Sequence, residues 1–273
     1  MIYIAFHRAL VAFLLLAALT LIGCGGDVDT EDDGRPVEAL YNEAFDLMVD
    51  GDYSLASTAF DEVDRQHPYS PWATKAQIMS SYAYYKSGQY DQALISAERF
   101  IQLHPGHKDT PYAYYLRAIS YYEQITDVGR DQQTTRFALQ ALQEIIRRYP
   151  DSAYARDARF KIDLAQNQLA GKEMAVGRFY LMRHQYSAAI NRFRLVIERY
   201  QTTSHAPEAL HRLVEAYLSL GVVPEAQATA AVLGYNFPGS QWYLDSYTLL
   251  TGKNLTPQED QESWISRTWK KIF

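Results

Sequence analysis

The feature that most constrains the fold of this 273-residue chain is an internal repeat. Two consecutive units each carry a Gly-x-Tyr step in the middle and a proline at the end. Gly51 and Pro68 of the first unit lie 37 residues before Gly88 and Pro105 of the second. Each unit has the apolar spacing of two amphipathic helices that separate at the glycine. One helix pair cannot bury its apolar face alone, so such units must stack on their neighbours.

Three further copies of this pattern follow along the chain. The third starts at Pro111 and ends at Pro150, the fourth passes through Gly177, and the fifth runs past Gly221 to Pro238. The units resemble the tetratricopeptide repeat, a helix pair of about 34 residues with small residues where its helices cross. The sequence therefore predicts an all-α fold, a right-handed solenoid of about five tetratricopeptide-like helix pairs.

Composition excludes several other classes of protein. Hydrophobic residues make up 48% of the chain, which is enough to bury a sizeable core, and a single Cys rules out an internal disulfide framework. A net charge of −6 gives no excess of positive charge of the kind that binds nucleic acid. The seven histidines are scattered, and no phosphate-binding loop, zinc-protease motif or nucleophile elbow occurs. We therefore expect no enzyme activity, metal or cofactor.

Residues 1–23 have the pattern of an export signal, because their apolar run is too short to span a bilayer. Leu21-Ile22-Gly23-Cys24 resembles a bacterial lipobox, which implies that Cys24 becomes the lipidated N-terminus. The alternative is an N-terminal membrane anchor with an unmodified Cys. Since Gly25 follows in place of Asp, we expect anchoring at the periplasmic face of the outer membrane. Residues 24–35 are rich in acidic side chains and predict a solvated tether.

The C-terminus predicts an amphipathic helix. Thr256-Pro257-Gln258-Glu259 has the spacing of a capping box with proline at the first helical position. Trp264, Ile265 and Trp269 then share one helical face, so the helix either caps the last repeat or touches a partner or a membrane surface. The predicted parts are thus a signal (1–23), a tether (24–35), N-terminal repeats (36–150), C-terminal repeats (151–252) and a C-terminal helix (253–273).

The 22 tyrosines point to a second feature, an aromatic face. In the tetratricopeptide repeat, the first helix of each pair lines the concave surface at its second, fifth, ninth and twelfth positions. In the first three copies these positions include Tyr41, Phe45, Tyr82, Tyr85, Tyr112, Tyr115 and Tyr122. Core packing is one interpretation of each ring. The other, which we favour for the set, is a groove that binds an extended peptide with aromatic side chains.

The chain as a whole resembles the BamD family of lipoproteins, which belong to the β-barrel assembly machinery of Gram-negative outer membranes. The specific points are His67-Pro68-Tyr69-Ser70-Pro71-Trp72, the stretch from Arg99 to Pro105, and Asn191-Arg192-Phe193. An insertion between Gln124 and Thr135 is also similar, although Gln132 stands where relatives have proline after the Arg130-Asp131 pair. Such a long loop is either functional or merely tolerated.

The resemblance implies a periplasm-facing scaffold without enzyme activity. Its N-terminal repeats would receive the C-terminal signals of unfolded outer-membrane barrel proteins. Its C-terminal repeats would dock on the barrel-forming subunit, BamA, alongside the other lipoproteins of the machinery. By the resemblance, Arg192 corresponds to the family arginine on the BamA side; the alternative is an ordinary charge on a helix surface. Arg130 and Asp131 are further candidates for docking. The competing function is a generic periplasmic repeat scaffold in cell-wall or export-channel assembly.

Overall fold

The computed structural model describes residues 34–270, and within this range the chain forms twelve α-helices and no β-strand. The chain divides into a unit that ends at Pro36 and a unit that starts at Val37, and the twelve helices belong to the second unit. Cys24, the export signal and most of the predicted tether lie outside the described residues.

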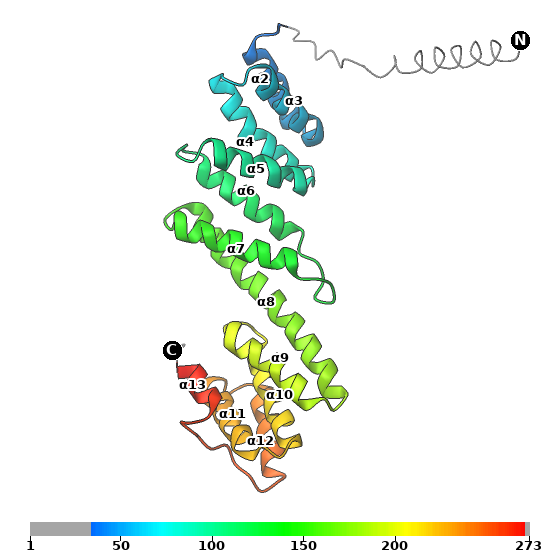
Figure 1. Cartoon of the computed structure of the whole chain (residues 1–273), viewed down its shortest axis with the longest axis vertical. Helices are drawn as coiled ribbons and strands as arrows, with labels where there is room; N and C mark the ends of the chain where they lie inside the picture. The colour runs from blue at the N-terminus through cyan, green and yellow to red at the C-terminus, as the bar shows by residue number, and fades with distance from the viewer. Residues whose placement is uncertain (1–33, 271–273) are drawn as a thin grey trace, which may run out of the picture. The chain divides into compact units, whose positions relative to one another are not determined.

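Within the second unit the helices pack in chain order as pairs (Figure 1). The pairs are α2 (Val37–Val49) with α3 (Tyr53–Gln66), α4 (Pro71–Lys86) with α5 (Tyr90–Leu103), α6 (Thr110–Glu123) with α7 (Gln133–Arg148), α8 (Ala153–Met182) with α9 (Tyr186–Arg199), and α10 (Ala206–Ser219) with α11 (Val223–Asn236). Two further helices, α12 (Gln241–Thr251) and α13 (Trp264–Lys270), pack against the last pair. The predicted all-α solenoid of helix pairs is confirmed.

The turns inside the first two pairs explain the Gly-x-Tyr steps, and the turn of the fifth pair has the same glycine conformation. Gly51, Gly88 and Gly221 have φ values of 87°, 76° and 75°, in the left-handed region. A residue with a side chain pays about 1–2 kcal/mol for this conformation, which is why glycine recurs at the turn. Between α8 and α9 the same place is taken by His184, with φ of 57°.

The first three pairs also end alike. The residues that follow α3, α5 and α7 are His67, His104 and Tyr149, with φ between −128° and −135° and ψ between 53° and 56°. Each of them precedes a proline, which disfavours the helical conformation of the residue before it. The prolines therefore end the second helix of each of the first three pairs at a fixed point.

The longest helix, α8, links two hydrophobic cores. Ala155 and Ala158 in its first half pack with residues of α5, α6 and α7. Ala170 and Met174 in its second half pack with residues of α9, α10 and α11. Figure 1 shows α7 along the first half of α8 and α9 along the second half. One helix of 30 residues thus serves as a packing surface for both halves of the solenoid.

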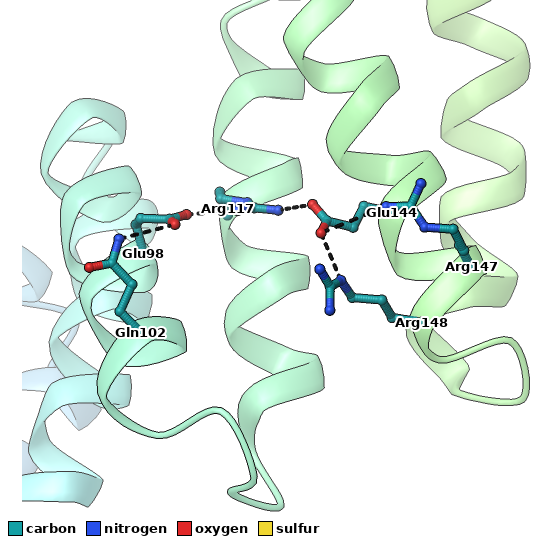
Figure 2. Close-up of polar contacts among 6 residues, drawn as sticks. All are labelled: Glu98, Gln102, Arg117, Glu144, Arg147 and Arg148. Carbon is teal, nitrogen blue, oxygen red and sulfur yellow. Dashed lines mark hydrogen bonds and ion pairs between the residues drawn. The ribbon is translucent and has the colours of Figure 1, made fainter.

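Arg117 connects three helices of the second and third pairs through ion pairs. Arg117 on α6 donates through Nη1 to Glu98 on α5 at 2.7 Å and through Nη2 to Glu144 on α7 (Figure 2). Glu144 also accepts from Arg148 Nε at 2.7 Å. Only 16% of the Arg117 side chain and 22% of the Glu144 side chain are exposed, so the ion pair between these two residues is partly shielded from water.

The C-terminal helix begins at Trp264, so the capping box predicted at Thr256 with helix start at Pro257 is wrong. The chain before α13 binds to α11 in place of forming a helix. Gln227 Nε2 donates to the Thr256 carbonyl at 2.7 Å, and the Gln258 N–H donates to the Gln227 carbonyl at 3.3 Å. The second bond pairs the Gln258 N–H, which a helix starting at Pro257 would leave without an intrahelical partner.

Candidate functional site

Five tyrosines from three helices converge on one surface. Tyr82 and Tyr85 lie on α4, Tyr112 and Tyr115 on α6, and Tyr154 on α8. The Tyr154 ring lies 5.1 Å from that of Tyr115 and 5.5 Å from that of Tyr112. The hydroxyl groups of Tyr82 and Tyr85 lie close enough to interact electrostatically with that of Tyr112. We call these five residues the tyrosine cluster.

Charged side chains border the cluster. The Tyr115 hydroxyl donates to Asp157 Oδ2 at 2.7 Å, and the Tyr85 hydroxyl donates to Glu123 Oε1 at 3.3 Å. Lys161 Nζ lies 2.8 Å from Asp157 and 5.5 Å from the centre of the Tyr122 ring. Tyr122, the remaining predicted residue of α6, is therefore connected to the cluster through the Lys161–Asp157 ion pair.

The environment of the cluster raises the pKa of the hydroxyl groups of Tyr85, Tyr112, Tyr115 and Tyr154. Burial raises the pKa of Tyr112 and of Tyr115, and the nearby Asp157 carboxylate adds to the effect at Tyr115. Burial together with Glu123 raises the pKa of Tyr85 to about 12. The rings are half-buried, so each offers an apolar edge and a hydroxyl that donates or accepts a hydrogen bond. Such a surface suits a peptide that has both aromatic side chains and free backbone groups.

The two predicted groove residues of α2 lie elsewhere. Tyr41 is half-buried, and its ring lies 5.4 Å from that of Phe60 and 4.8 Å from that of Trp72, against the core of the first pair and α4. Phe45 is 41% exposed. Within the described residues, no ring contact joins either of them to the tyrosine cluster. The structure thus brings together the residues predicted on α4 and α6, and it does not add those on α2.

Sequence reasoning missed Tyr154 and Asp157, although a signal was present. The first concave positions of the second and third copies, Lys75 and Tyr112, lie seven residues after the closing prolines Pro68 and Pro105. The same count from Pro150 gives Asp157, and Tyr154 lies one helical turn before it. The first helix of the fourth pair therefore starts at the beginning of α8, well before the Gly177 that marked the fourth copy.

The insertion between α6 and α7 is held in place by Gln132, the residue after the Arg130-Asp131 pair. Gln132 is buried, and its Nε2 donates to the carbonyls of Asp127 at 3.1 Å and Arg130 at 3.2 Å. Its Oε1 accepts from the Thr135 hydroxyl at 2.9 Å. Asp131 Oδ2 accepts from the Gln133 N–H at 2.9 Å, at the start of α7. Arg130 and Asp131 are both exposed, and Asp131 also pairs with Arg136 of α7 at 3.9 Å.

The remaining predicted residues lie in the C-terminal half. Arg192 on α9 is 43% exposed and pairs with Glu173 on α8 at 3.0 Å. Ile265 and Trp269 are buried in the core formed with α9, α10 and α11. Trp264 Nε1 donates to the Tyr217 hydroxyl at 2.7 Å. Of the two interpretations of the C-terminal helix, the structure matches a cap on the last pair.

Two other properties concern residues 34–270 only. No helix in this range combines the length and the hydropathy needed to cross a membrane. In the same range, no group of three or more His, Cys, Asp or Glu side chains is placed to hold a metal ion.

Comparison with known proteins identifies the family. The model of the YfiO family, described as an outer membrane lipoprotein, matches residues 33–233. The outer membrane protein assembly factor BamD of Caulobacter vibrioides is 52% identical over 246 residues, which cover 89% of this chain and 81% of the relative. The factor of the same name from Rickettsia prowazekii is 43% identical over 241 residues, with coverage of 88% and 96%. A tetratricopeptide-repeat protein of Thermus thermophilus superposes with a TM-score of 0.37 at 20% identity, covering 79% of this chain and 100% of that one. Because the family model spans most of the chain and both relatives align over more than three quarters of their length, this chain belongs to the BamD family of outer membrane protein assembly factors.

Proposed function

We propose that this chain is a lipid-anchored scaffold on the periplasmic face of the outer membrane, and that its N-terminal repeats bind the C-terminal segments of unfolded barrel proteins. The observation that carries the proposal is the tyrosine cluster. Half-buried rings give a large contact area at low cost in conformational entropy, and their hydroxyl groups pair with peptide backbone. Segments that end in an aromatic residue have the matching chemistry.

The second part of the proposal is that the C-terminal repeats dock on a BamA-like barrel subunit, together with the other lipoproteins of that machinery. Arg192 carries this part. Its guanidinium is partly exposed and pairs with Glu173 through Nη1, so the other nitrogens remain for a carboxylate of a partner. Arg130 on the insertion is an additional exposed cation for the same purpose. The relatives named as outer membrane protein assembly factors support this assignment.

The third part is the anchor. Cys24 follows the lipobox-like residues, and acyl chains on it would hold the chain at the membrane surface with about 0.8 kcal/mol for each buried CH₂. Replacing Cys24 by Ser is expected to release the exported chain from the membrane fraction.

Affinity purification from detergent-solubilised envelopes tests the docking. We expect the tagged chain to bring down a large outer-membrane barrel protein with periplasmic domains in stoichiometric amount. The variant Arg192→Glu is expected to lose it, whereas Arg199→Glu, an exposed position on the same helix, is expected to retain it. Recovery of cell-wall enzymes or a secretion channel, without the barrel protein, would contradict the proposal.

A further inference from the structure

Helix α12 starts in the same way as the first helix of a repeat. Phe237, which precedes Pro238, has φ of −134° and ψ of 54°, close to the values of His67 and Tyr149 before their prolines. Two residues after each proline, a serine side chain accepts a hydrogen bond from an N–H of the first turn, at Ser70, Ser152 and Ser240. The helices α4, α8 and α12 therefore share one register and start three residues after the proline.

This register identifies the side of a first helix that contacts the second helix of its pair. Ser81, the thirteenth residue after Pro68, donates through its hydroxyl to the Ala93 carbonyl of α5 at 3.1 Å. Gln77, the ninth, bonds to His104, directly after α5, at 2.8 Å. The sixth residue lies one helical turn before the ninth, on the same side. The ninth and thirteenth residues of the third pair are also buried, namely Tyr114 and Ala118.

The same positions of α12 are uncharged and exposed. The sixth and ninth residues after Pro238 are Leu244 and Tyr247, which are 54% and 44% exposed, and the thirteenth, Thr251, is exposed as well. Helix α12 packs against α10 and α11, and the helix that follows it, α13, packs against α11. Within residues 34–270, these three side chains are therefore not covered by a second helix. We call them the α12 face.

Helix α8 provides an internal comparison for this face. Because α9 packs along the second half of α8, the corresponding three positions near the start of α8 are exposed too (Figure 1). There, all three residues are charged: Arg156, Arg159 and Asp163. Charged residues suit a repeat face that stays in water, because exposed apolar residues there promote association. The uncharged α12 face, with its Leu and Tyr, has instead the composition of a face that contacts another surface.

The repeat itself defines the structure that fits such a face. Each of the five second helices has an alanine, an apolar residue four positions later and another three positions after that, and all of these side chains are fully buried. The alanine lets two helix backbones approach closely, as the bond from Ser81 to the Ala93 carbonyl shows. The five sets are Ala56, Phe60 and Val63; Ala93, Ala97 and Phe100; Ala138, Leu142 and Ile145; Ala189, Phe193 and Val196; and Ala226, Ala230 and Leu233.

We propose that the α12 face binds an amphipathic helix of a partner protein, which carries an alanine and two apolar residues in this spacing and completes a sixth helix pair. A second folded copy of this chain does not supply such a helix, because its five sets are already buried in its own core. Since the α12 face has no charge, contact with it depends on shape and on apolar area. The site is separate from the tyrosine cluster and from Arg192 and Arg130, so it does not depend on the function proposed for them.

The test measures fluorescence anisotropy with the purified chain and a labelled peptide of residues 90–103, the α5 sequence. A lactam bridge between the side chains at positions 95 and 99, which are exposed on α5, keeps the peptide helical. A second bridged peptide carries Ala93→Leu and Phe100→Ser. The chain variants are Leu244→Glu and Tyr247→Glu. Leu55→Glu and Tyr69→Glu make the same changes at positions that are 59% and 100% exposed. Circular dichroism verifies the fold of each variant.

We expect the bridged α5 peptide to bind, and both α12 substitutions to raise its Kd about ten-fold or more. The peptide with the changed stripe is expected to lose affinity to a similar extent, while Leu55→Glu and Tyr69→Glu leave the Kd unchanged. Absence of binding, equal binding of the two peptides, or unchanged affinity of the folded α12 variants would overturn the proposal. Sedimentation of the chain alone, and with vesicles of phosphatidylethanolamine and phosphatidylglycerol, provides a further arm. Self-association or vesicle binding that Leu244→Glu abolishes would assign the face to a second copy or to a membrane, and would overturn the partner assignment.

Discussion

The Tyr115 hydroxyl on α6 donates a 2.7 Å hydrogen bond to the Asp157 carboxylate on α8, and this bond connects the third and fourth helix pairs. Burial alone would raise the pKa of Asp157, but the hydrogen bonds from Lys161 and Tyr115 outweigh it and hold this pKa below its usual value. The same bond fixes the position of the Tyr115 ring against Tyr154. The geometry of the tyrosine cluster thus depends on a residue of α8.

Replacing Tyr115 by Phe tests this connection. The ring remains, but the hydrogen bond is lost, so we expect the free energy of unfolding to fall by about 1 kcal/mol and the pKa of Asp157 to rise. Urea unfolding and NMR titration of the Asp157 side chain measure the two effects. Tyr69→Phe is the matched control, because Tyr69 is 100% exposed. An unchanged pKa of Asp157 in Tyr115→Phe would show that the hydroxyl does not stabilise the carboxylate.

Gly177 is required by close packing between α8 and α9. A Cβ at this position would lie 2.4 Å from Cε1 of Phe193, which is buried completely. We expect Gly177→Ala to lower the free energy of unfolding by about 1–3 kcal/mol, the usual cost of overpacking. Gly106→Ala, where a Cβ meets nothing within 4 Å, is expected to leave thermal stability unchanged or slightly increased. Equal melting temperatures for Gly177→Ala and the wild type would contradict the packing seen here.

Arg117 is expected to stabilise the second and third pairs through its two carboxylate partners. Arg117→Met leaves Glu98 and Glu144 without this cation, at an expected cost of about 1–3 kcal/mol. Adding Glu98→Gln removes the carboxylate that pairs with Arg117 and with no other cation among the described residues, and should restore part of the loss. Urea midpoints of the single and double variants measure this coupling. If the midpoint of the double variant falls by the sum of the changes seen in the two single variants, the two residues are not coupled.

Stability should fall in mildly acidic solution because of buried histidines. Burial, with a contribution from the neighbouring Arg212, lowers the pKa of His211 from 6.5, although Glu215, Asp245 and Glu208 oppose the shift. The unfolded chain then binds more protons than the folded chain below pH 6.5, so the stabilisation is present above that pH and is lost as the pH falls. Burial lowers the pKa of His104 and His205 in the same direction.

His211→Asn isolates the contribution of one histidine. Its side chain can keep a hydrogen bond to the Ser246 hydroxyl, which lies 2.9 Å from His211 Nδ1, but it does not titrate. We expect the melting temperature of this variant to depend less steeply on pH between 7.5 and 5.5 than that of the wild type. Identical slopes would mean that His211 binds protons equally in the folded and unfolded chains.

The sequence predicted the helix pairs well because glycine and proline act locally. A left-handed φ at Gly51 and the restriction imposed by Pro68 on the residue before it do not depend on distant contacts. The start of α13 was missed for the opposite reason. The segment at Thr256 bonds to Gln227 of α11, a contact between residues far apart in sequence that outweighs the local capping signal.

The site was predicted in part for a similar reason. The tyrosines of α4 and α6 follow the repeat spacing, so their common face was evident. Tyr41 has the same spacing, but its ring packs against Phe60 and Trp72 of the first core, and such packing depends on which neighbours are large. The contribution of α8 was missed because a 30-residue helix contains parts of two repeats and carries no glycine turn between them.

The most direct test of the central claim is the affinity of the tyrosine cluster for a barrel-protein signal. Fluorescence anisotropy with a labelled peptide from the C-terminus of an outer-membrane barrel protein, ending in an aromatic residue, measures it. We expect the double variant Tyr82→Ala/Tyr85→Ala to raise the Kd about ten-fold or more, as loss of aromatic contacts does at interfaces, and Tyr69→Ala to leave it unchanged. An unchanged Kd for the double variant, with its fold intact by circular dichroism, would contradict the claim that this cluster binds the signal.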